Sequence, residues 1–289
     1  MAQRVVTGMN VGEIMTERAD VVAVEIPGTR DDALEYLQDR AFSSVPVIKK
    51  TDGGEVYRGI VSRGALIERP DEDQLALLAS EVDPTTSETE LRSVAERMLV
   101  AGDRRVPVVE DDRLEGIVTV TDVVRAIARE EDTGLTVADV ASEAVNCVYA
   151  ETPLTVAERE LSHAGVPYAV VLDDEGTTGI LTEVDILAVA RVVEGETETG
   201  ESIANQDDEW AWEGIKAVGN SYMPTRNVEI PDESVSAFMT GDIVSISGSL
   251  PVAEAAKLMI EHGIEQIPMM EGNSLAGIVQ DIHLLEAVR

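Results

Sequence analysis

Cysteine and long apolar runs are both scarce in this chain. Cys147 is the single cysteine, so no intrachain disulfide can form and a reducing compartment is expected. No stretch reaches the ~18 consecutive apolar residues of a membrane-spanning helix, and residues 1–8 lack the apolar run of a signal peptide. We therefore expect a cytoplasmic protein that is not associated with a membrane.

Positive charge is scarce as well. The 289 residues include 22 Lys and Arg against 56 Asp and Glu, for a net charge of −34. Such a surface repels nucleic acids and anionic lipids, because both bind clustered cations. The acidic residues are spread along the whole chain, which is typical of a solvated surface. We interpret it as an adaptation to molar salt, where the Debye length falls to ~3 Å; an ordinary acidic protein is the alternative.

The patterns of common active sites are missing too. His163, His262 and His283 are scattered, without metal-ligand spacing to a cysteine or a carboxylate pair. There is no phosphate-binding loop ending in Gly-Lys-Ser/Thr and no Gly-x-Gly-x-x-Gly after a strand. His163 and His262 fall at corresponding helix ends, where a cation is favourable. A structural role is therefore expected for them.

What the chain does have is an internal repeat. The string Gly-Ile-Val-Thr-Val-Thr-Asp at 116–122 recurs, altered, at 59–62, 179–182 and 277–280. Each copy follows a hydrophobic-Pro-hydrophobic step, whose prolines are Pro46, Pro107, Pro167 and Pro268. The first three prolines lie about 60 residues apart and the fourth about 100 later, so one supersecondary unit is repeated with an insertion before the last copy.

Each copy is expected to form a strand, a helix, two strands and a second helix. In the second copy, Ser87 and Glu90 have the spacing of a capping box before a helix over 91–100, whose apolar residues recur at helical spacing. Apolar runs over 106–109 and 114–120, separated by acidic residues, predict a hairpin.

The closing helix of the second copy is expected over 123–128, capped by Thr121 or Asp122. The fourth copy repeats the order. Its predicted elements are a helix over 249–262, strands over 266–270 and 276–279, and a closing helix.

The proline step and the Gly-hydrophobic-hydrophobic-Thr-x-x-Asp string resemble the cystathionine-beta-synthase (CBS) domain. Met15-Thr16 and Met239-Thr240 open the first and fourth copies, as is common in that family. The resemblance implies an α+β fold of four tandem CBS repeats paired into two modules. The expected boundaries are 11–74, 75–133, 134–195 and 234–289, with the insertion at 196–233. The four-copy arrangement is similar to the gamma subunit of AMP-activated protein kinase and its archaeal relatives.

The resemblance also implies adenine-nucleotide sites in clefts between paired copies. In the family, the Asp that closes the string accepts hydrogen bonds from the ribose, and the Ser/Thr residues and the following helix N-terminus face phosphate. Carried over to this chain, Thr119, Thr121 and Asp122 supply the second copy's site. Thr182 and Asp185 supply the third copy's site. Helix capping is the alternative role of both aspartates.

The first and fourth copies depart from the string. Ala65 stands where Asp is expected in the first copy, although Ser62 is retained, and Gln280 and His283 replace Thr and Asp in the fourth. Alanine cannot accept a hydrogen bond from a ribose, and histidine would do so poorly. We therefore expect one competent site in each module, and empty or weak sites at Ala65 and His283.

Two adjacent arginines, Arg104 and Arg105, directly precede the second copy's proline step. Basic residues at this place in the kinase gamma subunit meet phosphates, so the resemblance implies a phosphate-binding role, for which a guanidinium fork is suited. Pairing with Asp103 or Glu110 is the alternative. The third copy has Ala164-Gly165 at these positions, which favours AMP or a sulfonium nucleoside over ATP there.

The base would lie against the partner copy. For the second copy's site the resemblance points to Thr16, Phe42 and Ser43, where Phe42 could stack on adenine or pack in the core instead. For the third copy's site it points to Thr240 and Ile264.

The insertion carries both tryptophans of the chain, Trp210 and Trp212, after a polar run. A strut packed on its own module, a docking surface for another subunit and a lid over an unused cleft are the three interpretations.

Together these features predict a regulatory sensor of AMP, ADP or ATP that requires no cofactor. It would act as a monomer or homodimer and signal to an unidentified effector protein. The alternatives are a constitutive scaffold without a ligand and a sensor of an S-adenosylmethionine-type ligand. An enzyme is not expected, because four repeats leave no room for a catalytic domain.

Overall fold

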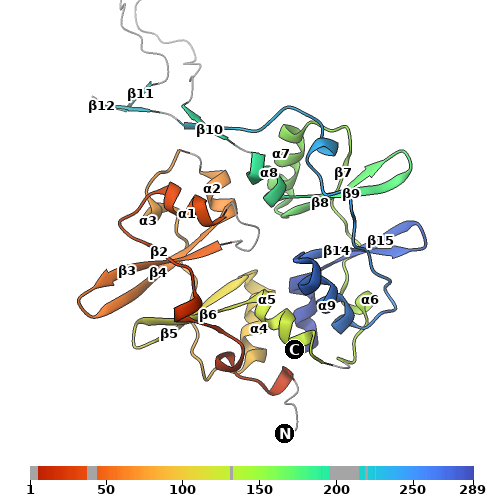
Figure 1. The fold of residues 1–289 in the computed structure, drawn as a ribbon, viewed down its shortest axis with the longest axis horizontal. Coiled ribbons are helices and arrows are strands. Elements are labelled where there is room, and N and C mark those ends of the chain that lie inside the picture. The colour runs from red at the N-terminus through yellow and green to blue at the C-terminus, as the bar shows by residue number, and fades with distance from the viewer. Residues whose placement is uncertain are drawn as a thin grey trace, which may run out of the picture.

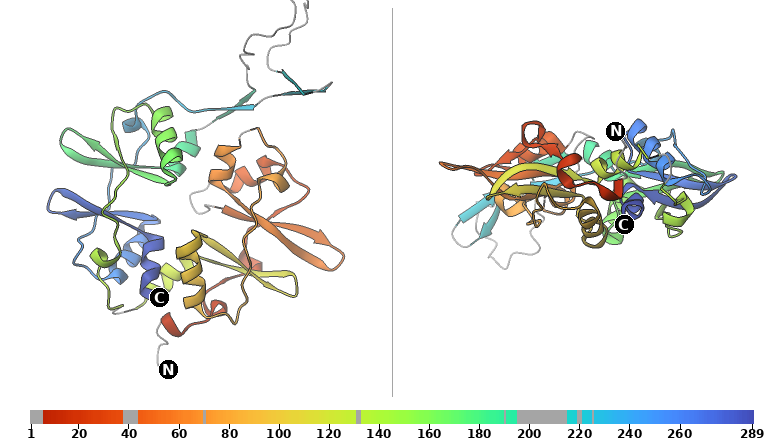
Figure 2. Two further views of the ribbon diagram at one scale, coloured as in Figure 1. Left: turned by 180° about the vertical axis from the view of Figure 1, so that it is seen from behind. Right: turned by 90° about the horizontal axis from the view of Figure 1, so that it is seen from below.

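Four copies of one helix-hairpin-helix unit surround a common centre (Figure 1). The structure is a computed structural model that describes residues 6–37, 44–69, 71–130, 133–189, 191–194, 215–218, 221–224 and 226–289. The first and second copies form one module and the third and fourth form the other. Viewed from the edge, the two modules make a flattened disc (Figure 2).

The elements of the first module follow the chain in the expected order, except that the opening strand of the second copy is reduced to a single bridge between Thr85 and Val108. Those of the first copy are η1 (Val6–Gly8), η2 (Val11–Glu13), β1 (Thr16–Glu17), η3 (Arg18–Asp20), β2 (Val24–Glu25), α1 (Arg30–Leu37), β3 (Ser44–Thr51), β4 (Gly54–Ser62) and α2 (Arg63–Glu68). Those of the second copy are α3 (Leu75–Leu78), α4 (Leu91–Ala101), β5 (Arg105–Glu110), β6 (Arg113–Thr119) and α5 (Val120–Ile127).

The second module repeats this order, and the opening strand of the fourth copy is likewise a single bridge, between Ile246 and Met269. Elements of the third copy are α6 (Val137–Val140), β7 (Cys147–Tyr149), α7 (Leu154–Ala164), β8 (Tyr168–Asp173), β9 (Gly176–Thr182) and α8 (Glu183–Val189). Elements of the fourth copy are η4 (Val235–Ala237), α9 (Val252–His262), β14 (Gln266–Glu271), β15 (Ser274–Gln280) and η5 (Asp281–Val288).

The two copies of a module are joined by strand pairing. In the first module β1 pairs antiparallel with β6, which places Thr16 opposite Ile117, and one six-stranded sheet results. Single bridges make the corresponding contact elsewhere: Ile60 with Ser80, Ile180 with Thr240, and Ile278 with Ser142. Each of these isoleucines is the Gly-Ile of the repeated string, so the string marks where the paired copies meet.

The glycine of the string permits this close approach. A Cβ on Gly116 would lie 2.5 Å from the carbonyl oxygen of Thr16, and one on Gly179 would lie 3.1 Å from that of Thr240. Real side chains do not approach a backbone oxygen as closely as the first distance. The recurring glycine is therefore required by packing between copies.

The cores are distributed unequally between the copies. One cluster of buried apolar residues joins the second and fourth copies across the disc, and includes Ile127 of α5, Met259 of α9 and Leu285 of η5. Separate clusters fill the first copy, around Leu66, and the third, around Leu161. The two modules are thus held together mainly by the second and fourth copies.

One capping box and one helix start predicted for the second copy are wrong. The first helix begins at Leu91 as expected, but the Glu90 side chain makes no capping hydrogen bond, and the Ser87 hydroxyl donates to Glu110 Oε1 at 3.1 Å instead. The closing helix begins at Val120 rather than 123, and its cap is Thr119. The Thr119 hydroxyl accepts from the Asp122 N–H at 3.1 Å, which starts the helix one turn earlier.

In the fourth copy the long helix begins at Val252, after Pro251 as N-cap, and not at residue 249. Its second strand begins at Ser274 instead of residue 276.

The insertion leaves and re-enters the disc through paired strands. β10 (Arg191–Glu194) pairs antiparallel with β13 (Arg226–Glu229), from Arg191 opposite Glu229 to Glu194 opposite Arg226. β11 (Ile215–Val218) pairs with β12 (Ser221–Pro224). Trp210 and Trp212 lie outside the described residues, so the three interpretations of the insertion stay predictions.

Candidate functional site

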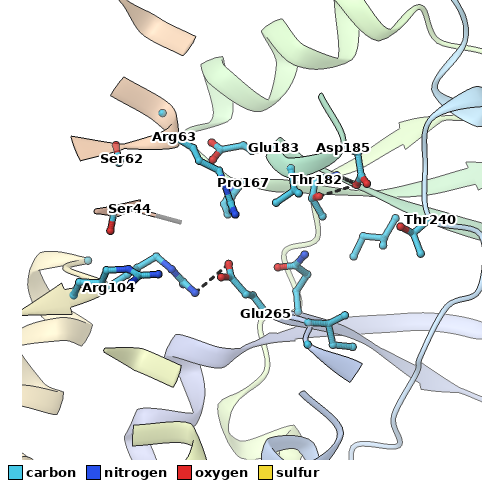
Figure 3. A pocket seen from close by; sticks show the side chains of 18 of the residues that line it. Ser44, Ser62, Arg63, Arg104, Pro167, Thr182, Glu183, Asp185, Thr240 and Glu265 are labelled. Carbon is cyan, nitrogen blue, oxygen red and sulfur yellow. Dashed lines mark hydrogen bonds and ion pairs between the residues drawn. The ribbon is translucent and has the colours of Figure 1, made fainter. Parts of the chain in front are cut away.

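A cavity of about 560 Å³ lies where the four copies meet. It is lined by the start of α2 in the first copy, the loop before β5 in the second, the start of α8 in the third, and the loop before β14 in the fourth. Figure 3 shows side chains from both modules pointing into it. The cavity therefore belongs to the disc as a whole, and neither module could form it alone.

The four residues expected at the third copy's site are all in the lining: Thr182, Asp185, Thr240 and Ile264. Asp185 Oδ2 accepts hydrogen bonds from the N–H and the hydroxyl of Thr182, at 3.0 and 2.7 Å. Thr240 reaches the same place because its backbone is bridged to Ile180. The aspartate thus caps the start of α8 while it lines the cavity, so the two roles considered for it are geometrically compatible.

The first copy's cleft opens into the same cavity, although an empty or weak site was expected there. Ser44, Ser62 and Arg63 from this copy and Ser80 from the second line it. Ser62 accepts from the N–H of Ala65 at 3.2 Å, which is the capping bond that the string makes elsewhere. The missing carboxylate at Ala65 leaves hydroxyl groups and a buried guanidinium on this side.

Arg104 and Arg105 line this central cavity. Neither of the carboxylates considered as partners for Arg104 pairs with it: its guanidinium contacts Asp281 and Glu265 of the fourth copy, with shortest distances of 2.5 and 3.1 Å. Asp103 is instead 3.7 Å from Arg97. The sequence could not indicate this partner, because it follows from the way in which the two modules face each other.

Burial affects the pKa of both arginines. Burial lowers the pKa of Arg104, but the attraction of Asp281 and Glu265 outweighs it, so the pKa lies above its usual value. Burial lowers the pKa of Arg105 to about 10; Glu265 opposes this shift, and Arg104 adds to it. Both guanidinium groups are therefore charged at neutral pH.

Arg104 and Arg105 were expected at the second copy's site but face this cavity, whereas Thr16, Thr119, Thr121 and Asp122 of that site are not in its lining. Asp122 Oδ2 accepts from the N–H and the hydroxyl of Thr119, at 2.9 and 2.8 Å, and Oδ1 accepts from Arg125 at 2.9 Å. Thr121 is exposed, and Thr16 lies opposite Ile117. The other expected residues, Phe42 and Ser43, lie outside the described part of the chain.

The fourth copy keeps the capping geometry with different chemistry. The Gln280 N–H donates to Nδ1 of His283 at 3.3 Å, the bond that an aspartate accepts in the second and third copies. Burial lowers the pKa of His283, against a smaller opposing effect of Glu286, so the neutral ring that can accept this bond is favoured. The Gln280 side chain also hydrogen bonds with the buried hydroxyl of Tyr168.

The two sides of the cavity differ in charge. The three arginines, Arg63, Arg104 and Arg105, come from the first module, which contributes one carboxylate, Asp103, whereas Glu183, Asp185, Asp242 and Glu265 come from the second. Sequence analysis missed Arg63 and Glu183, which share one position of the repeated string, directly after Ser62 and Thr182. A ligand with hydroxyl groups at one end and a negative charge at the other would be complementary to this arrangement.

Within the described residues, no group of three or more His, Cys, Asp or Glu side chains is arranged to hold a metal ion. In the same part of the chain, no helix has the length and apolarity needed to cross a membrane.

Comparison with known proteins places these repeats in a family. The model of the CBS domain matches residues 11–72, 80–129, 137–191 and 235–289. The protein MJ1404 of Methanocaldococcus jannaschii, which is uncharacterised, is 25% identical over 283 residues, 96% of this chain and 61% of its own length. The chain thus spans less than two thirds of that relative.

Two solved structures have the same overall arrangement. A conserved protein of Pyrococcus horikoshii has a TM-score of 0.64 at 25% identity, covering 97% of this chain and 100% of its own. Protein MJ1225 of M. jannaschii, described as a candidate archaeal homologue of the AMP-activated kinase gamma subunit, has a TM-score of 0.75 at 16% identity, with the same coverage. Four matched segments covering most of the sequence establish that this chain belongs to the CBS domain family.

Proposed function

We propose that this chain is a regulatory sensor of adenine nucleotides, without catalytic activity of its own, that signals to a separate effector protein. The observation that carries the proposal is the meeting of Thr182, Asp185 and Thr240 with Arg104 and Arg105 in one cavity. Carboxylate and hydroxyl groups suit a ribose, and guanidinium groups suit phosphate oxygens. In the third copy, where Ala164-Gly165 supply no charge, the arginines of the other module would take the phosphates.

Signalling would follow from the position of the cavity. A nucleotide held by the third copy and by Arg104 touches both modules, so its binding energy depends on how the modules are packed. A ligand shifts a conformational equilibrium only by its difference in affinity between the two states. We propose that an effector protein recognises the packing that the nucleotide favours, in a cytoplasm of high salt to which the charge of −34 is suited.

The test is thermal unfolding in molar KCl with AMP, ADP, ATP, S-adenosylmethionine and NAD. A ligand at 100 times its dissociation constant stabilises the folded state by ~2.7 kcal/mol, which moves the midpoint by a few degrees. Asp185→Ala should remove most of the ligand-induced shift in the midpoint. Asp122→Ala should reduce any further part of the shift that comes from binding at the second copy's site.

Asp139→Ala is a matched control for the lost cap. Asp139 accepts from the N–H and the hydroxyl of Thr136 at 2.8 and 2.7 Å, as Asp185 does from Thr182, but it is exposed and is not in the cavity lining. It should lower stability by about 1 kcal/mol and leave the ligand shift intact. If no ligand shifts the wild-type midpoint, the proposal is wrong and a scaffold, in which both aspartates only cap helices, is the better account.

S-adenosylmethionine is the second candidate ligand, because the cavity is lined by more carboxylates than guanidinium groups. A shift with this cation and none with AMP would assign the site to it.

A further inference from the structure

Arg104 makes two carboxylate contacts of different kinds. Its Nη1 and Nη2 donate to Oδ1 and Oδ2 of Asp281, at 3.0 and 2.5 Å, and Nη2 also lies 3.1 Å from Oε2 of Glu265. The Asp281 side chain is 5% exposed, whereas that of Glu265 is 38% exposed and lines the cavity. One partner is thus enclosed in the protein, and the other faces the space that a ligand would enter (Figure 3).

The enclosed contact is fixed by the surrounding backbone. The Ile282 N–H donates to Asp281 Oδ1 at 2.7 Å, and the Asp281 N–H donates to the carbonyl oxygen of Glu265 at 2.7 Å. Removing Arg104 from Asp281 would leave a buried carboxylate without its counter-charge, which is strongly unfavourable. We therefore expect this contact to persist when the cavity is filled.

The Glu265 contact can be replaced more easily. An ion pair with a partly exposed carboxylate contributes little to stability, and the Glu265 side chain has solvent to turn into. A phosphate oxygen can accept the same charge-assisted hydrogen bond from the guanidinium. Glu265 therefore occupies a place that a phosphate group could take.

Charge makes this replacement selective. Because Asp281 already balances Arg104, the carboxylate of Glu265 is an additional negative charge that faces the cavity. It also acts on Arg105, since it opposes the burial that lowers the pKa of Arg105 to about 10. An anionic ligand must therefore displace or tolerate this charge, whereas an uncharged ligand on the third copy's side does not.

We infer that Glu265 is a specificity-determining residue of the cavity, which holds the place of a phosphate group at Arg104 and weakens the binding of phosphate-bearing ligands. This inference rests on the proposed function for the identity of the ligand. It adds that the Glu265 carboxylate competes with a phosphate group of the ligand for the guanidinium of Arg104.

The experiment compares wild type and Glu265→Gln by calorimetric titration with adenosine and AMP, in KCl at one concentration. The substitution keeps the size and a hydrogen-bond acceptor and removes the charge. We expect the affinity for AMP to rise about fivefold, which corresponds to the free energy of a partly exposed ion pair. The affinity for adenosine should change less than about twofold. Equal changes for the two ligands, or weaker binding of AMP, would contradict the inference.

Asp242→Asn is the control for general charge. Asp242 also lines the cavity, and no ion pair joins it to either arginine among the contacts of the described residues. Removing its charge should raise the affinity for AMP less than Glu265→Gln does. An equal gain from both variants would mean that Glu265 acts only through the overall potential, and would overturn its specific role at Arg104.

A pyrophosphate arm separates this inference from the proposed function. If adenosine, AMP and the other adenine ligands all fail to bind, the proposed function fails, and thermal unfolding with pyrophosphate then tests Glu265 alone. Greater stabilisation of Glu265→Gln than of wild type would support the inference. Equal stabilisation, or none in either protein, would overturn it.

Discussion

Arg104 and Glu265 hold the same position in two different copies, three residues before the prolines Pro107 and Pro268, and they form an ion pair across the disc at 3.1 Å. Duplication of one unit thus gave opposite charges to equivalent positions that face each other. Asp281, which takes the other side of the guanidinium, stands directly after the capping residue Gln280 of the repeated string. This contact between the modules is built from positions that the proline step and the string define in each copy.

Arg104→Ala should destabilise the protein strongly, because it leaves the Asp281 carboxylate buried without a counter-charge. We expect a loss of about 3 kcal/mol in the free energy of unfolding, the lower end of the usual range, since the Arg104 side chain is 26% exposed. Urea unfolding in molar KCl measures it. Lys257→Ala, which removes an exposed pair with Glu254, should cost less than about 0.5 kcal/mol. Equal losses in the two variants would refute the role given to the buried pair.

Gly116→Ala should weaken the pairing of the first two copies. The new methyl group would lie 2.5 Å from the carbonyl oxygen of Thr16, so the strands must separate, at a cost of about 1–3 kcal/mol. Gly241→Ala is the control, because nothing lies within 4 Å of its Cβ position. Unfolding midpoints of both variants check the prediction, and an undisturbed Gly116→Ala protein would show that the close approach is not needed.

His283 should make stability depend on pH. Burial lowers its pKa from the ordinary value of 6.5, so the unfolded chain binds a proton more readily than the folded chain. Stability is then present above the unfolded pKa and is lost as pH falls through the folded pKa.

In His283→Asn the amide oxygen can still accept from the Gln280 N–H, but the side chain does not titrate. We expect the unfolding free energy of wild type to fall relative to this variant as pH is lowered from 7.5 towards 5, because the other titrating groups are common to both proteins. Parallel pH profiles for the two proteins would exclude this role for the ring.

Hydrogen exchange should be slower in the second and fourth copies than in the first and third. Because one apolar cluster joins α5 to α9 and η5 across the modules, amides of α5 and α9 should open only with large parts of the fold. Amides of α2 and α8, which belong to copies with separate cores, should exchange faster. Mass spectrometry of exchanged peptides checks this, and similar protection of all four helices would count against the unequal interface.

Much of the fold could be predicted because the proline step and the string mark the element boundaries within each repeat. The proline fell in a strand in three copies and directly before the strand in the third, and the string marked both the second strand of each hairpin and the start of the helix after it. The errors were local: a hydroxyl at Ser87 that bonds Glu110 instead of capping a helix, and a helix that begins at Val120 with Thr119 as its cap. The first depends on a partner distant in the chain, and the second depends on which of several neighbouring side chains caps the helix.

The central cavity was predicted only in part. Thr182, Asp185, Thr240 and Ile264 follow from the pairing of neighbouring copies, which the repeated string defines. That the first copy's cleft would merge with the third copy's, and that Arg104 would meet Asp281, depends on how one module faces the other. This packing is determined by apolar contacts spread over four helices, and no single motif records it.

The paired strands β10 and β13 bring the two ends of the insertion side by side at the rim of the disc. Four matched residue pairs, from Arg191 with Glu229 to Glu194 with Arg226, mean that the intervening chain starts and finishes at one point. Its length is therefore uncoupled from the dimensions of the disc. A fluorescent reporter protein could therefore be inserted between these two strands. It would report on the folding of the disc without interrupting its core.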